Sequence, residues 1–145
     1  MPVELGEQAV CEGLARRLAG PHEQPGGIVW VKDGDEVVVW LDSLRVELAP
    51  AQIRVRVDLE TDQTGRDEQE VVIALAPRSG PPSLLAVAGD CTAGGEALAA
   101  RWGRTLQDAV WGALLDLADE RAGDRVAGIA ADDGTLVVHA VGGAR

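Results

Sequence analysis

The segment IVWVKDGDEVVVW at residues 28–40 restricts the possible folds more than any other part of the chain. Its central pair, Asp33-Gly34, is preferred in two-residue type I′ turns, because both central residues of that turn need a positive φ. The segment therefore predicts a β-hairpin that places Trp30 opposite Val37. Both faces of this hairpin are apolar, whereas a hairpin with one face in water alternates between apolar and polar side chains. We therefore expect protein to cover it on both faces.

Later segments predict further strands. SLRVELA and IRVRVDLE alternate between apolar and polar or charged residues, which is typical of strands with one face in water. Two more strands are predicted over residues 70–76 and 83–88, and a closing hairpin is predicted around Asp133-Gly134.

Apolar residues recur at helical spacing in two segments. The first predicts a helix over residues 3–19, because a Gly-Pro pair follows it directly. The second predicts the longest helix near residues 95–121, with Gly123 as its C-terminal glycine. Helix, consecutive strands, helix and hairpin together predict an α+β fold with a largely antiparallel, multi-stranded meander sheet. The length fits a single α+β domain, residues 1–145.

The chain carries 24 acidic and 13 basic side chains, a formal net charge of −11. Binding to nucleic acid or to an anionic membrane surface requires clustered Lys and Arg, so neither partner is expected. No apolar run approaches the roughly 18 residues of a membrane span, and the N-terminal segment lacks the pattern of a signal peptide. Cys11 and Cys91 are far apart and fit reduced thiols better than a disulfide framework. These features predict a cytoplasmic protein.

Asp58, Glu60 and Asp62 recur at alternate positions with Gly65 close behind, which at first suggests a calcium-binding loop. An EF-hand loop needs acids at positions 1, 3 and 5, glycine at 6 and glutamate at 12, and no starting residue here satisfies that pattern. The acids instead continue the outward face of the preceding strand. Nor do the two His and two Cys residues have the spacing of a zinc site. We predict a solvated hairpin turn, no metal site and no cofactor.

The segment LLAVAGDCTAGGEAL at residues 84–98 is the most site-like part of the chain. A strand leads through a glycine-containing loop to a helix N-terminus, where backbone N–H groups can hold an anion. A P-loop also needs a lysine after its second glycine, which is missing here. A phosphatase-type loop needs an arginine six residues after Cys91, where this chain has Ala97. Asp90, Cys91 and His139 are retained as candidate ligand-binding residues.

No motif identifies a family or a catalytic mechanism. None of the three serines lies in a G-x-S-x-G segment, and two His without any Tyr leave few general acids and bases near neutral pH. We therefore predict no catalytic residue.

Trp40, Trp111 and Leu115 form the expected contact surface. Trp40 faces the opposite side of the hairpin from Trp30, and Trp111 lies with Leu115 beside the apolar stripe of the long helix. One helix layer covers only one sheet face, so the remaining apolar surface needs the N-terminal helix, an apolar ligand or a second copy of the chain. We expect a non-catalytic, chaperone- or adaptor-like protein that acts through protein–protein contact, as a homodimer or a subunit of a complex. The alternative is a small-ligand-binding protein or small enzyme with a pocket around Cys91.

Overall fold

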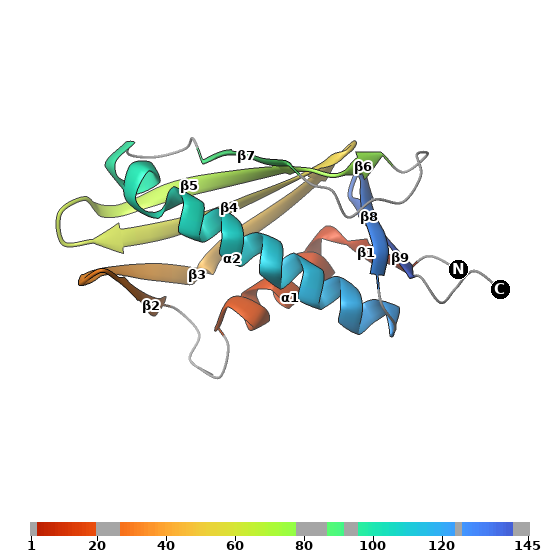
Figure 1. Cartoon of the computed structure of the whole chain (residues 1–145), viewed down its shortest axis with the longest axis horizontal. Helices are drawn as coiled ribbons and strands as arrows, with labels where there is room; N and C mark the ends of the chain where they lie inside the picture. The colour runs from red at the N-terminus through yellow and green to blue at the C-terminus, as the bar shows by residue number, and fades with distance from the viewer. Residues whose placement is uncertain (1–2, 20–26, 78–86, 92–95, 124–125, 141–145) are drawn as a thin grey trace.

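The computed structural model has an α+β fold, as the sequence predicts (Figure 1). It describes the backbone of residues 3–19, 27–77, 87–91, 96–123 and 126–140. Side chains are described for these residues except 76–77, 87–91, 96–100 and 127. In chain order the elements are β1 (Val3–Gly6), α1 (Glu7–Ala19), β2 (Gly27–Lys32), β3 (Asp35–Ala49), β4 (Gln52–Thr61), β5 (Gly65–Ala74), β6 (Ala76–Pro77), β7 (Val87–Cys91), α2 (Glu96–Ala122), β8 (Val126–Asp132) and β9 (Thr135–Ala140).

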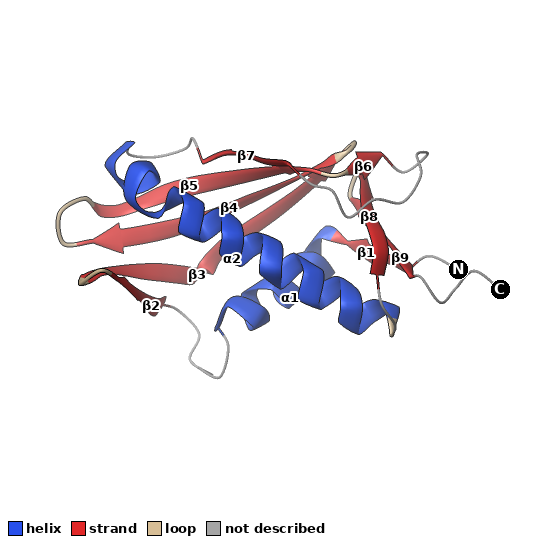
Figure 2. Cartoon of the chain, viewed as in Figure 1, coloured by secondary structure: helices blue, strands red, loops and turns tan. Residues whose placement is uncertain are grey.

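The described strands divide between two sheets (Figure 2). The larger has the order β2-β3-β4-β5-β7 and is antiparallel throughout, so consecutive strands are neighbours as in the predicted meander. The smaller has the order β1-β9-β8-β6, in which only β6 and β8 pair in parallel. Ala51, in the β3–β4 turn, links the sheets: its N–H donates to Ala131 O, and its O accepts from Leu75 N. The two sheets thus meet at one end of the larger sheet.

The first helix begins later than the sequence predicts. We expected a helix over residues 3–19, but Val3–Gly6 is a strand that pairs with β9, and α1 begins at Glu7. Leu5 is buried and pairs with Leu136. A single apolar residue fits a helical stripe as well as a strand, so only the partner strand, over 130 residues away, decides the backbone conformation. The helix start is then fixed by Glu7, whose carboxylate accepts a hydrogen bond from Leu48 N at 2.7 Å.

Strand β3 changes its buried face midway along its length. Residues 37, 39 and 41 are buried in its first half, and residues 44 and 48 in its second. Because side chains alternate with a period of two, a regular strand would expose one of these sets. A bulge between Trp40 and Arg45 changes the phase. Ser43 Oγ stabilises the bulge, since it donates to Trp40 O at 2.6 Å and accepts from Asp58 N at 2.8 Å.

Helix α2 packs on one face of the five-stranded sheet, which we call its inner face. Helix α2 crosses this face, and α1 packs against α2 and β3 (Figure 1). Gly13 allows the two helices to approach closely, because a Cβ there would lie 2.7 Å from Leu117 Cδ1. The core unites the following buried side chains, among others: Val39, Val55, Leu59, Ile73, Trp102, Leu106, Leu114, Val10 and Leu14.

The opposite, outer face has no helix over it among the described residues. Val29 and Val31 on β2 are 57% and 66% exposed on this face. The expectation that protein covers the first hairpin on both faces is therefore met only on its inner face within the described part of this chain. The physical reason is that α2 packs on the side of the sheet where nearly every strand contributes apolar residues.

We predict opposite effects for two glycine substitutions in the helices. Gly112→Ala meets no atom within 4 Å, so its gain in helix propensity should raise the free energy of unfolding by about 0.5–1 kcal/mol. Gly13→Ala gains the same propensity but forces Leu117 to move, and overpacking of about 1–3 kcal/mol should make the protein less stable than wild type. Urea unfolding followed by circular dichroism measures both. Equal stabilisation by the two substitutions would contradict the close contact between the helices.

Candidate functional site

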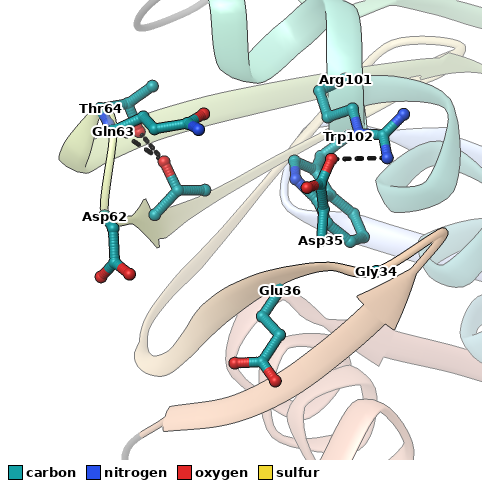
Figure 3. Close-up of a pocket in the computed structure, with 9 residues that line it drawn as sticks. Gly34, Asp35, Glu36, Asp62, Gln63, Thr64, Arg101 and Trp102 are labelled. Atoms are coloured by element: carbon teal, nitrogen blue, oxygen red, sulfur yellow. Dashed lines mark hydrogen bonds and ion pairs between the residues drawn. The ribbon is translucent and has the colours of Figure 1, made fainter.

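A pocket of about 270 Å³ lies between two hairpin turns and helix α2 (Figure 3). The turns are those of the β2–β3 and β4–β5 hairpins. We call it the inter-hairpin pocket, and its lining consists of Gly34, Asp35, Glu36, Thr61, Asp62, Gln63, Thr64, Arg101 and Trp102.

Turn chemistry explains why the pocket forms here. Asp33 and Gly34 have φ values of 52° and 82°, as the predicted type I′ turn requires, and Lys32 pairs with Asp35. The ladder between β3 and β4 begins only at Val38 and Glu60, so the two hairpin turns are not paired with each other. The space between them becomes the pocket.

Arg101 of α2 forms one wall of the pocket. Its Nη2 lies 2.6 Å from Asp35 Oδ2 (Figure 3). It also donates to Lys32 O at 3.2 Å, which ties the helix to the first hairpin turn. Both charged side chains remain about half exposed, so the ion pair itself adds at most about 1 kcal/mol to stability. Next to it, Trp102 is almost fully buried and closes the pocket on the core side.

The opposite wall is the β4–β5 turn. Its acidic residues are those whose spacing first suggested a calcium-binding loop. Thr61 Oγ1 accepts from Thr64 N at 3.0 Å and lies 2.6 Å from Thr64 Oγ1, so the turn closes on itself. Gly65 follows with a φ of 70°. The predicted hairpin is confirmed. The described residues contain no group of three or more His, Cys, Asp or Glu side chains placed to hold a metal ion.

The lining sets limits on what the pocket can bind. Asp35, Glu36 and Asp62 outnumber the single guanidinium of Arg101, so the pocket favours a cationic or hydrogen-bond-donating group over an anion. The nine lining residues include no His, Cys, Ser or Lys.

The predicted ligand-binding residues lie in different sheets. Asp90 and Cys91 are at the end of β7 in the larger sheet, and their side chains lie outside the described residues. His139 is in β9 of the smaller sheet, opposite Gly128 as the turn register predicts. Its Nε2 is buried and has no hydrogen-bond partner among the described residues. His139 therefore lies in a different sheet from Asp90 and Cys91.

The residues of the expected contact surface are also separated. Trp40 lies on the outer face, where its Nε1 donates to Glu60 Oε1 at 3.1 Å and Arg66 Cζ lies 4.6 Å from the ring centre. Trp111 and Leu115 lie on α2, half-buried against the core on the inner side of the sheet. The sheet therefore stands between Trp40 and the two helical residues.

The outer face next to Trp40 carries a feature that the sequence patterns did not single out. Gly27 pairs with Trp40, and a Cβ at this glycine would lie 2.7 Å from Val38 Cγ1 and 3.2 Å from the indole. Trp40 thus covers a glycine on the neighbouring strand, as aromatic side chains do at sheet edges. Val29 and Val31 remain the exposed large hydrophobics of the described residues. In the sequence, the alternation of these two valines with Ile28 and Trp30 was the signal that could have identified them as one exposed face of the strand.

No protein-family model, curated protein or solved structure matches this chain. In the part that the structure describes, neither helix combines the length and hydropathy of a membrane span.

We predict slow alkylation of Cys11. Its Sγ donates to Leu44 O at 3.2 Å, and burial, with a smaller contribution from Glu12, raises the pKa of the thiol. A raised pKa lowers the thiolate fraction at neutral pH, and the thiolate is the nucleophile. In a Cys91→Ser variant, iodoacetamide at pH 8 should modify Cys11 more slowly than free cysteine, and urea should remove the difference. A native rate equal to that of free cysteine would contradict the protected environment.

Proposed function

We propose that this protein acts through contact with another polypeptide, and that strand β2 pairs with β2 of a second copy of the chain. The observation that carries the proposal is the exposure of Val29 and Val31, 57% and 66%, on a strand at the edge of a sheet. Adjacent exposed hydrophobics on a regular edge strand are typical of surfaces that pair with another chain.

The backbone of β2 supports pairing at this edge. In a two-residue hairpin, the residues that flank the turn form a hydrogen-bonded pair, here Lys32 and Asp35. The alternation of an antiparallel ladder then places Val31 and Val29 in non-hydrogen-bonded pairs with β3. Their N–H and C=O groups point away from β3, toward the edge of the sheet. No described strand pairs with that edge.

Two-fold symmetry suits this strand. Antiparallel pairing of two β2 strands around Trp30 places Val29 of each copy opposite Val31 of the other. The strand sequence GIVWVK contains no acidic residue, so the paired strands themselves bring no carboxylates together. It also contains no proline, and its one charged residue, Lys32, is the last residue of the strand, next to the turn. Trp40, held by Glu60 and Arg66 on the same face, adds a rigid apolar surface beside the valines.

We predict that Val31→Lys weakens self-association. Lysine on an exposed edge strand opposes pairing, and Val31 is exposed enough for the substitution to leave the fold intact. Sedimentation velocity over a concentration series should show a dimer for wild type and at least about a tenfold higher dissociation constant for the variant, about 1.4 kcal/mol. Gln63→Lys, which adds the same charge at an exposed turn, should behave like wild type.

Salt provides a second test of the dimer. Each copy carries a net charge of −11, so two copies repel and screening reduces that repulsion. Dimerisation should therefore strengthen when sodium chloride rises from about 50 to about 500 mM. A wild type that sediments as a monomer at every concentration and both salt conditions would remove the second copy as the partner.

A further inference from the structure

Three arginines lie together on the outer face of the larger sheet, on the far side of the β3 bulge from Val29 and Val31. Arg45 is in β3, and Arg54 and Arg56 are in β4. With Val46 and Glu47 they line a groove of about 190 Å³, which we call the arginine groove. In a chain with 24 acidic and only 13 basic side chains, this grouping reverses the overall sign of the charge.

The arrangement of the arginines disfavours the fold unless something compensates their charge. Arg45 lies directly opposite Arg56, and like charges in that position are destabilising. Arg56 Nε is 2.7 Å from Glu70 Oε2. Among the described residues, the other ion pairs on this face join Arg66 to Asp58 and Asp42, and none of those found includes Arg45 or Arg54.

Arg54 has a further unmet requirement. Its Nε is buried, and the described residues offer it no hydrogen-bond acceptor. A buried N–H without an acceptor loses its hydration and gains nothing in return. The cross-strand neighbour Glu47 lies opposite Arg54 in the ladder but makes no hydrogen bond with that Nε. Protein atoms cover this Nε, whereas the Nη groups of Arg54 are not among the buried unpaired atoms, so an acceptor seated in the groove would meet the Nη groups.

We infer that the arginine groove binds a small oxyanion, a carboxylate or a phosphate group, through the guanidinium groups of Arg45 and Arg54. Guanidinium presents a planar fork of N–H donors that matches both groups. The volume of about 190 Å³ is smaller than the roughly 300 Å³ or more of pockets for drug-sized ligands. The groove therefore suits a single charged group. This inference does not depend on the pairing of β2.

Titration with inorganic phosphate and with succinate at constant ionic strength, followed by NMR amide shifts, tests the inference. Wild type should show saturable shifts in β3 and β4 with at least one of the two anions, and the anion that binds identifies the preferred oxyanion. Arg45→Gln and Arg54→Lys should each weaken binding at least tenfold. Arg54→Lys keeps the charge but removes the fork, so it separates bidentate binding from general attraction. Arg16→Gln, at an exposed position on α1, is the matched control.

Thermal unfolding gives a second readout. Without oxyanion, Arg45→Gln should melt about 2 °C above wild type, because it removes the like-charge pair. Saturating oxyanion should raise the melting temperature of wild type more than that of the variant, since the variant binds it at least tenfold more weakly. The inference is overturned if neither anion shows saturable binding, or if Arg45→Gln and Arg54→Lys bind as tightly as Arg16→Gln.

Discussion

The burial of one face of the five-stranded sheet beneath α2 is the interaction on which the rest of the structure depends. Each fully buried Val, Leu or Ile side chain contributes about 1.5–3 kcal/mol relative to exposure, and nearly every strand adds such residues to the inner face. The bulge in β3 keeps both halves of that strand in register with this face, and Ser43 satisfies the backbone groups that the bulge leaves unpaired. Because burial is one-sided, the outer face remains available for contacts.

The outer face is divided into regions of different chemistry. Val29 and Val31 make one end apolar, Trp40 with Arg66 and Glu60 forms a fixed middle, and the arginine groove lies beyond the bulge. The inter-hairpin pocket is different again, since carboxylates dominate its lining. A strand edge suits a polypeptide partner, whereas clustered guanidinium groups suit an oxyanion. The two proposals therefore concern separate surfaces of one sheet and can succeed or fail independently.

Local chemistry made several elements predictable. The Asp33-Gly34 turn and its register follow from the positive φ that a type I′ turn needs, and the observed pairing of Trp30 with Val37 agrees. Gly123 ends α2 with a φ of 67°, and its N–H donates to Asp119 O, as a C-terminal glycine should. By contrast, β1 could not be predicted, because four residues carry too little periodicity and their conformation depends on distant β9.

The sequence by itself determined the α+β class, the hairpins and the extent of the long helix, because turn residues and apolar periodicity act over a few residues. Only the tertiary structure decided which residues from different elements meet. It placed Trp40 on the opposite side of the sheet from Trp111, joined Asp35 to Arg101 across 66 positions of the chain, and set Arg45 opposite Arg56. These juxtapositions depend on strand order, on the bulge and on the face that the helices cover, and those features are fixed by packing of the whole chain rather than by any local pattern.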